Sequence, residues 1–330
     1  MQEDIKALEA KIKEESAKLY LLKTELQKGV IGQEDMIEGL IIALLTGGHI
    51  LLEGLPGLAK TRAITRLADA VALNFSRVQF TPDMLPADLI GTSIFHPKEG
   101  TFSPEKGPLF AHLVLADEIN RAPAKVQSAL LEVMAEKQIT LAKETYQLEP
   151  PFLVLATQNP IEQEGTYSLP EAQIDRFMMK IQVGYPTKAE ERKVLDLVTS
   201  FKKDGPAAQV LSREDLLYMS DLTDQIYVDP KIKDYVLELV DATRNPKDHN
   251  LDHLSSLLEF GASPRAGITL IIAAKAKAFI KGQGYVTPEL IRQMAPAVLR
   301  HRILLSYEAE AEGKTPDWVI SEILNQVPIP

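Results

Sequence analysis

The sequence lacks cysteine altogether among its 330 residues. This absence excludes disulfides, thiolate metal sites and cysteine nucleophiles, and it fits a reducing compartment. Long apolar runs are also missing, since no stretch approaches the roughly 18 residues of a membrane span. The segment "MQEDIKALEAKIKEE" is charged throughout and has no apolar signal-peptide core. We expect a soluble, cytoplasmic protein without a membrane span.

A surplus of basic residues is missing too. The formal net charge is −10, with 36 Lys and Arg against 46 Asp and Glu. Proteins that grip a phosphate backbone normally carry a basic stripe that displaces counterions. Nucleic acid is therefore a disfavoured partner. The hydrophobic content of 45% suffices for a sizeable core, and the length predicts more than one domain.

Hydrophobic periodicity divides the chain into three parts. Residues 1–28 predict one amphipathic helix, which either packs on its own domain or forms a short coiled coil. Residues 29–185 alternate strand-like runs ("HILLEG", "HLVLADE", "PFLVLATQNP") with helical stretches, which predicts an α/β domain whose mostly parallel sheet is covered by helices. Residues 186–330 show helical patterns without convincing strands, so we expect a smaller all-helical domain.

The stretch "GLPGLAKT" lies between strand-like "HILLEG" and helix-like "RAITRLADAVA". A phosphate-binding loop needs backbone N–H groups at a helix start, a lysine for the outer phosphates and a hydroxyl for magnesium. Gly54 and Gly57 provide the backbone freedom, Lys60 the charge and Thr61 the hydroxyl. Ala59 stands where glycine is usual, and we expect a right-handed helical conformation there, which a methyl group tolerates. Taken alone, the stretch could also be an ordinary turn.

Polar residues follow two further predicted strands. "HLVLADEIN" ends in Asp117 and Glu118, and hydrolysis needs one group that orients the magnesium shell and another that orients or deprotonates water. Adjacent acids at a strand end are often a solvated turn, but Lys60 and Thr61 favour the catalytic interpretation. "PFLVLATQNP" ends in Asn159, whose amide can hold the water or touch the outermost phosphate, although Asn is also a common turn former.

Two arginines complete the candidate catalytic set. "LPEAQIDRF" carries Arg176, and "GASPRAG" carries Arg265 at the start of a predicted helix. An arginine near the developing charge accelerates phosphoryl transfer. Without that context, either residue would be interpreted as a solvated surface group.

Taken in order, these stretches resemble the AAA+ ATPases. "GLPGLAKT", "VQFTPDMLPADLIGT", "ADEINRAPAKVQSALLEVMAE" and "ATQNPIEQEGTYSLPEAQIDRF" are similar to the MoxR family in particular, and the similarity covers about residues 29–325. The resemblance implies a P-loop AAA+ core with a C-terminal helical lid, binding of ATP and Mg2+, and a homo-oligomeric ring, expected to be a hexamer. In this family the alanine form of the loop is usual in working enzymes.

The resemblance also implies a role for each matching residue. Lys60 and Thr61 resemble the Walker A pair. Asp117 and Glu118 resemble the Walker B pair, with Glu118 as catalytic base, and Asn159 resembles sensor 1. The residues implied to contact ATP are Val30, Ile31, Gly32, Gly54, Pro56, Gly57, Leu58, Ala59, Lys60, Thr61, Arg62 and Asp117, of which Thr61 and Asp117 also hold the magnesium.

The remaining implied roles concern the edges of the site. Arg176 resembles the arginine finger that enters a neighbour's site, and Arg265 resembles sensor 2 on the lid, acting within its own subunit or across the boundary. "VIGQ", which begins at Val30, matches the segment beside the adenine, although locally it is only a turn before a helix.

Two hairpins are predicted within the core. "PADLIGTSIFHPKEGTFSPEKGPLF" fits the family's insertion in its second helix, with "PKEGTF" as the turn, and "KQITLAKETYQLEPP" forms the other hairpin. By resemblance these projections face a ring's pore or its client. The alternative is that they merely cover a sheet end.

His249 and His253 lie four residues apart, a spacing that on a helix could bind a metal. The stretch "RNPKDHNLDH" is loop-like and lacks a metal-binding motif, so a solvated surface is the favoured interpretation.

Three classes of function remain. The leading one is an ATP-driven remodelling chaperone, which the resemblance links with von Willebrand factor A domain proteins and the maturation of their client complexes. A nucleic-acid motor shares the core and the helix-2 insertion but would need basic projections. The charged residues of segment 83–108 are Lys98 and Lys106 against Asp83, Asp88, Glu99 and Glu105. A non-hydrolysing nucleotide-dependent scaffold would not need both acids, Asn159 and the candidate arginines.

Overall fold

The computed structural model describes residues 2–55, 57–98, 100–142, 144–160, 167, 169–198 and 205–330. Pro56, which the phosphate-loop prediction includes, lies outside these residues. The chain forms two compact units. Unit 1 comprises Met1–Tyr20, Met178–Lys180 and Tyr218–Pro330, and unit 2 comprises Leu21–Phe177 and Ile181–Leu217. The domain limits expected from the sequence, after residues 28 and 185, stay a prediction.

Helix α1 (Gln2–Gln27) confirms the predicted amino-terminal helix. Its apolar stripe is buried within the single chain at Ile12, Leu19, Leu22 and Leu26. Residues three and four apart lie on one face of a helix, so these side chains can pack together. The stripe therefore packs on its own protein, the simpler of the two expected arrangements.

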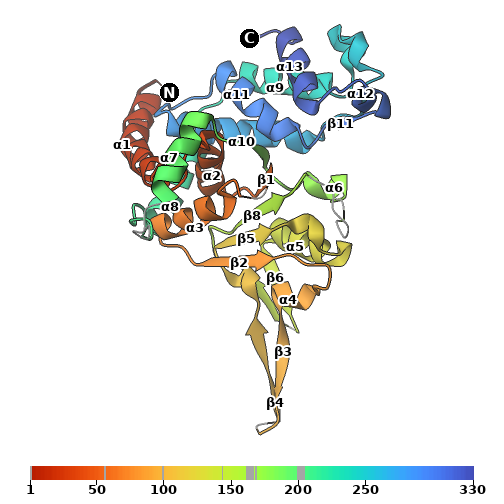
Figure 1. Cartoon of the computed structure of the whole chain (residues 1–330). Coiled ribbons are helices and arrows are strands. Elements are labelled where there is room, and N and C mark those ends of the chain that lie inside the picture. The colour runs from red at the N-terminus through yellow and green to blue at the C-terminus, as the bar shows by residue number, and fades with distance from the viewer. Residues whose placement is uncertain are drawn as a thin grey trace. The chain divides into compact units, whose positions relative to one another are not determined.

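A five-stranded sheet has the order β2-β5-β8-β1-β9 (Figure 1), and it belongs to unit 2 except for the first two residues of β9. The registered pairs β1–β8, β5–β8 and β2–β5 are parallel, as predicted. The strands are β1 (Ile50–Gly54), β2 (Phe75–Gln79), β5 (Leu113–Asp117), β8 (Leu153–Gln158) and β9 (Met179–Val183). Strands β2 and β9 were not predicted, because "FSRVQ" and "MKIQV" lack the continuous apolar run that marks β5 and β8.

Helices connect and cover these strands, as predicted for an α/β core. The predicted helices at α2, α3 and α5 are confirmed. Helices of unit 2 are α2 (Glu34–Thr46), α3 (Lys60–Val71), α4 (Pro86–Ile90), α5 (Ala124–Glu136), α6 (Glu171–Ile174) and α7 (Lys188–Val198), and α8 (Arg213–Asp224) contributes residues to both units. Short 3-10 turns are η1 (Pro108–Phe110) and η2 (Ile119–Arg121).

The core beside β5 and β8 follows from two periodicities. Every second residue of a strand points to the same face of the sheet. Val114 and Ala116 of β5 share one face with Val154 and Ala156 of β8. Residues of α5 at a spacing of four, such as Val126, Leu130 and Met134, form the apolar stripe that belongs to the same cluster. This packing holds the carboxyl ends of the two strands in a rigid frame.

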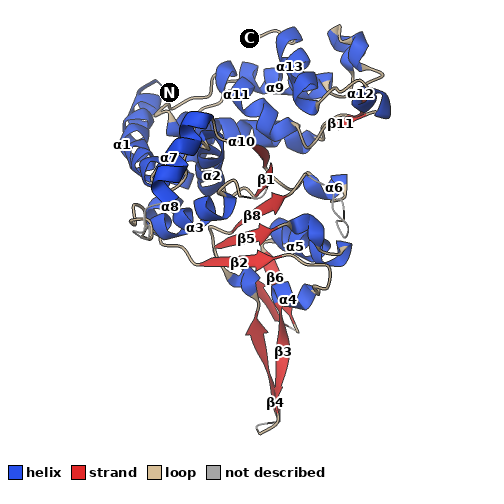
Figure 2. Cartoon of the chain, viewed as in Figure 1, coloured by secondary structure: helices blue, strands red, loops and turns tan. Residues whose placement is uncertain are grey.

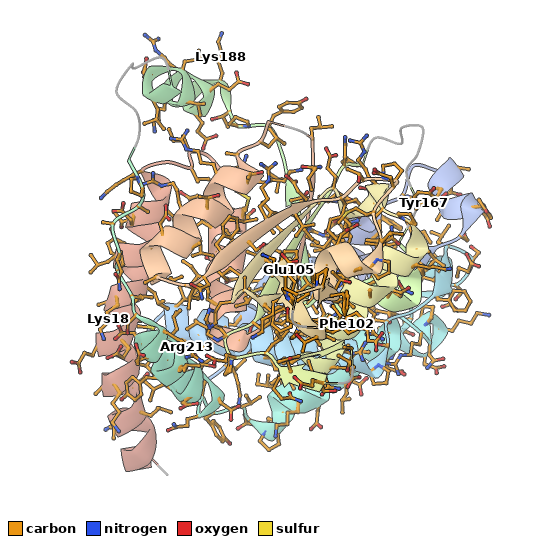
Figure 3. The ribbon with its side chains drawn as sticks, turned by 90° about the horizontal axis from the view of Figure 1, so that it is seen from below. Lys18, Phe102, Glu105, Tyr167, Lys188 and Arg213 are labelled. Atoms are coloured by element: carbon orange, nitrogen blue, oxygen red, sulfur yellow. The ribbon has the colours of Figure 1, made fainter. Side chains whose placement is uncertain are left out.

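Both predicted hairpins are confirmed. The first pairs β3 (Gly91–His96) with β4 (Thr101–Lys106), and the second pairs β6 (Gln138–Leu141) with β7 (Glu144–Gln147). Figure 1 shows the β3–β4 hairpin projecting from the rest of unit 2, and Figure 3 labels Phe102 and Glu105 on it. At its base a Cβ atom on Gly91 would lie 2.1 Å from the carbonyl oxygen of Glu105, so only glycine permits this close crossing.

Unit 1 is mainly helical (Figure 2). Its helices are α9 (Pro230–Ala242), α10 (Pro264–Ile280), α11 (Pro288–Leu299), α12 (Tyr307–Ala311) and α13 (Pro316–Gln326), with 3-10 turns η3 (Pro246–His249) and η4 (Asp252–Leu254). Side-chain caps begin α9, α11 and α13 at Asp229, Thr287 and Thr315. The expectation of no strands was wrong in one detail, since β10 (Leu258–Phe260) and β11 (Leu304–Leu305) form a small antiparallel pair.

The two histidines considered for a metal have separate carboxylate partners. The Nε2 atom of His249 lies 3.0 Å from Oδ2 of Asp241, and that of His253 lies 3.3 Å from Oε2 of Glu322. No group of three potential metal-binding acids or histidines occurs in the described stretches. Within the same stretches, no helix has the length and apolar character needed to cross a membrane.

Candidate active site

Strand β1 delivers the chain into the loop that starts α3. Ala59, the residue before α3, has φ 59° and ψ 15°, which is a left-handed conformation. The expected right-handed conformation is therefore wrong, because the loop demands the backbone shape that usually selects glycine. A left-handed L-residue costs roughly 1–2 kcal/mol, so Ala59 adopts a strained conformation.

The two glycines of the loop serve different purposes. Gly57 has φ 85°, and a Cβ atom there would meet nothing within 4 Å, so its backbone conformation is what requires glycine. A Cβ atom on Gly54 would lie 2.5 Å from the carbonyl oxygen of Val183. Close approach to β9 therefore requires the glycine at position 54.

A cavity of about 390 Å3 opens at this loop. Parallel strands end at one edge of their sheet, and the loop, β2, β5 and β8 all contribute to the cavity there. The lining residues are Gly54, Gly57, Leu58, Ala59, Lys60, Thr61, Arg62, Arg77, Gln79, Asp117, Glu118, Thr157 and Asn159. The structure thus brings together most of the residues that the sequence singled out.

Lys60, the first residue of α3, donates a hydrogen bond from Nζ to the carbonyl oxygen of Gly54. Burial lowers the pKa of Lys60 below its usual value, although nearby carboxylates, above all Asp117, oppose the shift. The cation is thus held at the start of a helix, where backbone N–H groups also favour an anion.

Asp117, the last residue of β5, is held by hydrogen bonds at both carboxylate oxygens. Oδ1 accepts from the hydroxyl of Thr157 at 2.7 Å. Oδ2 accepts from Arg77, with Nη2 at 2.7 Å and Nε at 3.2 Å. Hydrogen-bond partners of this kind orient a carboxylate toward the cavity that it lines.

Glu118 follows in a left-handed conformation, with φ 56° and ψ 53°. Its backbone N–H donates to the hydroxyl of Thr157 at 2.8 Å. Its Oε2 atom accepts from Nε2 of Gln79 at 3.1 Å and from Nη1 of Arg121 at 3.0 Å. Strained backbone conformations are frequent at functional sites, so this carboxylate, which lines the cavity, is the strongest candidate for a reacting group.

The residues present fit a nucleotide tail with magnesium. The hydroxyl of Thr61 and the carboxylate of Asp117 line the same cavity as Lys60, and magnesium prefers such oxygen ligands. Asn159 lines it from the end of β8, and its carbonyl oxygen accepts from Nδ2 of Asn120 at 3.4 Å. Thr61 and Asp117 would hold the ion, and the bound magnesium would neutralise negative charge on the outer phosphates.

The segment predicted to lie beside the adenine lines a second cavity in unit 2, of about 340 Å3. Val30, Ile31 and Gly32 share this cavity with Glu190 and Lys193 of α7, among other residues. Gly32 has φ 70°, and a Cβ atom there would lie 2.8 Å from the Glu190 carboxylate. The adenine-side role of this segment stays a prediction.

The two candidate arginines lie outside the lining of the first cavity. Arg176 donates from Nη1 to the carbonyl oxygen of Leu131, on α5, at 2.5 Å. Arg265 lies in the first turn of α10, in unit 1. Their catalytic roles remain predictions.

Sequence reasoning missed Arg77, Gln79 and Thr157, which hold the two acids. Arg77 and Gln79 lie two residues apart on β2, so their side chains project from the same face of the strand. Recognising "FSRVQ" as a strand, with polar residues alternating toward its carboxyl end, could have found them. Thr157 is buried, and its place in a strand gave no local signal of its role.

Known proteins share both parts of this chain. Residues 49–179 match the ATPase family associated with various cellular activities (AAA), and residues 253–323 match the AAA lid domain. Chaperone MoxR1 of Mycobacterium tuberculosis is 46% identical over 306 residues, covering 93% of this chain and 81% of that protein. Protein MoxR of Methylorubrum extorquens is 33% identical over 325 residues, covering 93% of each chain.

A solved structure agrees with these similarities. A crystal structure of a candidate ATPase from Cytophaga hutchinsonii has a TM-score of 0.93 and 48% sequence identity, and the match covers 99% of each chain. The predicted P-loop AAA+ core with a helical lid is confirmed. The chain belongs to the MoxR family of AAA+ ATPases.

Proposed function

We propose that this protein hydrolyses ATP in a magnesium-dependent reaction and uses the energy to remodel a protein partner. The observation that supports the proposal is one cavity, at the carboxyl ends of the strands, lined by Lys60, Thr61, Asp117, Glu118 and Asn159. A cation, a hydroxyl, two acids and an amide are the groups that phosphoryl transfer to water requires.

In the proposed reaction Lys60 binds the outer phosphates, and Thr61 with Asp117 holds the magnesium. Asn159 orients a water molecule, and Glu118 accepts its proton as the water oxygen bonds to the terminal phosphorus. The bond between that phosphorus and the bridging oxygen breaks, which leaves ADP and inorganic phosphate. Arg176 and Arg265 supply positive charge to the transition state.

We place this activity in a homo-oligomeric ring, a hexamer, in the cytoplasm. A relative that carries the name chaperone supports a protein-remodelling role, and the partner we propose is a von Willebrand factor A domain protein with its client complex. The projecting β3–β4 hairpin would contact the partner. Phe95 and Phe102 on this hairpin are 48% and 70% exposed, and their ring centroids lie 5.0 Å apart.

The charge of this hairpin argues against a nucleic-acid motor. Lys106 at its base lies over two aromatic rings, 5.0 Å from the centroid of Phe110 and 5.1 Å from that of Tyr146. Lys106 is thus engaged within unit 2, and Lys98, the other lysine of the hairpin, lies in the turn next to Glu99 in sequence. Phosphate binding along a surface would need several exposed cations.

Two variants test the hydrolytic proposal. Lys60→Ala should abolish detectable ATP binding in isothermal titration, because the outer phosphates lose their main cation. Glu118→Gln should bind ATP and magnesium while turnover falls by about two or more orders of magnitude, because the amide cannot accept the proton. Unchanged ATP affinity in the first variant, or near-normal turnover in the second, would refute the assigned site.

Two further measurements test the partner class. Turnover measured with and without DNA should be the same, and strong stimulation by DNA would instead support a nucleic-acid motor. Glu118→Gln, loaded with ATP, should retain the von Willebrand factor A domain partner in a pull-down, with Lys60→Ala as the matched control. Equal retention by both variants would show that nucleotide does not control the contact.

A further inference from the structure

Arg77 of β2 places a positive charge directly on the acid that is assigned to the magnesium. Two of its nitrogens, Nη2 and Nε, lie 2.7 and 3.2 Å from a single oxygen, Oδ2 of Asp117. Charge-assisted hydrogen bonds of this kind are about twice as strong as neutral ones. The guanidinium is therefore a specific partner of this oxygen.

The other oxygen of Asp117 is also engaged. Oδ1 accepts the hydroxyl proton of Thr157, so neither carboxylate oxygen of Asp117 is without a protein donor. An acid that orients a magnesium ion or its water shell must offer an oxygen to it. Of the two donors, Thr157 is buried, whereas the Arg77 side chain is 51% exposed. Arg77 is thus the partner that can move aside.

The surroundings of Arg77 allow such a movement. Strand β2 lies at the edge of the five-stranded sheet. Apart from its bonds to Asp117, the guanidinium donates from Nη2 to Oε1 of Gln79, at a long 3.4 Å. Half-exposed ion pairs exchange easily with solvent and contribute little free energy, so a bound metal ion can compete with one.

We propose that Arg77 sets the magnesium requirement of this site by competing with Mg2+ for Asp117. At low Mg2+ the guanidinium holds the carboxylate, and binding of Mg2+ with nucleotide displaces it. Arg77 is then a positioning residue, and its competition raises the Mg2+ concentration at which the site binds the metal. The proposal rests on the nucleotide and magnesium site of the proposed function.

The test is a magnesium titration of nucleotide binding in the full-length protein. A fluorescent, non-hydrolysable ATP analogue is held at a fixed concentration, and the Mg2+ concentration at half-saturation is measured. Arg77→Gln removes the competing charge and should lower this concentration by about three- to tenfold. Arg77→Lys keeps a positive charge but loses the two-nitrogen contact. Its Mg2+ concentration at half-saturation should therefore lie between those of the wild type and Arg77→Gln.

Lys125→Gln is the matched control, since it removes one charge at an exposed position of α5, outside the cavity lining. It should leave the magnesium half-saturation unchanged. Thermal unfolding verifies that each variant is folded, and if Arg77→Gln fails to fold, Arg77→Lys decides the question.

Two outcomes would overturn the proposal. If the Mg2+ concentration at half-saturation is unchanged in the arginine variants, the ion pair between Arg77 and Asp117 only links β2 to β5. An increased half-saturation would mean that Arg77 assists nucleotide binding directly. Either result leaves the proposed ATPase intact, whereas a wild-type protein that binds no nucleotide at any Mg2+ concentration would refute both.

Discussion

The hydroxyl of Thr157 on β8 donates a 2.7 Å hydrogen bond to Oδ1 of Asp117 on β5. The same hydroxyl accepts the backbone N–H of Glu118 at 2.8 Å. One buried side chain therefore fixes the carboxylate of the first acid and the backbone of the second. This bridge joins neighbouring parallel strands at the edge where the cavity opens.

Thr157→Val should weaken both the fold and the site. The isosteric valine leaves the part-buried N–H of Glu118 without its acceptor, so the free energy of unfolding should fall by about 1–3 kcal/mol. Magnesium-dependent nucleotide binding should weaken as well, because Asp117 loses one of its fixed donors. Chemical denaturation and isothermal titration measure the two effects. Thr157→Ser keeps the hydroxyl and serves as control, and equal behaviour of both variants would contradict the bridging role.

Ala59→Gly should stabilise the protein without abolishing nucleotide binding. The substitution relieves a left-handed alanine, worth roughly 1–2 kcal/mol, against a larger entropy loss of about 0.5–1 kcal/mol for glycine. The net gain in unfolding free energy should reach about 1 kcal/mol. Ala72, which ends α3 at φ 50°, offers a matched control outside the cavity lining. A loss of stability in both glycine variants would show that the strain argument fails.

His49 should make stability depend on pH. Burial lowers the pKa of His49 to about 4. Its Nε2 atom donates to the carbonyl oxygen of Met134 at 3.1 Å, and Nδ1 accepts from the N–H of Val154 at 3.0 Å, so the neutral ring fits. The unfolded chain, with a histidine pKa of about 6.5, binds the proton more tightly. The contribution of His49 to the free energy of unfolding is complete above about pH 6.5. It is lost as the pH falls toward 4, and the loss amounts to up to about 3 kcal/mol.

The measurement is chemical denaturation of wild type and His49→Asn between pH 7 and pH 4. The variant should be less stable at pH 7, because it loses a buried hydrogen bond, yet its stability should fall less steeply with acid. Parallel pH profiles for the two proteins would rule out His49 as the titrating group.

Arg176→Ala should bind ATP but lose hydrolysis, by about 10³–10⁵ if the arginine acts across a subunit boundary. Its bond to the carbonyl oxygen of Leu131 is local, so the side chain would have to exchange this partner for the neighbour's site. Mixing Arg176→Ala with Lys60→Ala should restore some turnover, because a mixed interface can pair an intact Arg176 with an intact Lys60. Mixed rings that form but stay inactive would exclude action in trans.

Local sequence was sufficient to predict much of the fold. The buried runs before Gly54 and Asp117 marked β1 and β5, and the helical periodicity of 34–46 and 124–137 marked α2 and α5. Each of these signals lies within one element, where the side-chain period follows directly from backbone geometry. The paired acids and the loop lysine were recognisable for the same reason, since each sits at the end of its own element.

Tertiary structure alone decided how the site is held. Asp117 is held by Arg77 and Thr157, each of which lies 40 positions from it in sequence. These contacts therefore depend on strand order and register. The left-handed conformation of Ala59 likewise follows from the path that the chain takes between β1 and α3. By itself the sequence determined which groups are available for phosphoryl transfer. The packed sheet decided which cation holds which acid, because hydrogen bonds form between atoms that are neighbours in space whatever their separation along the chain.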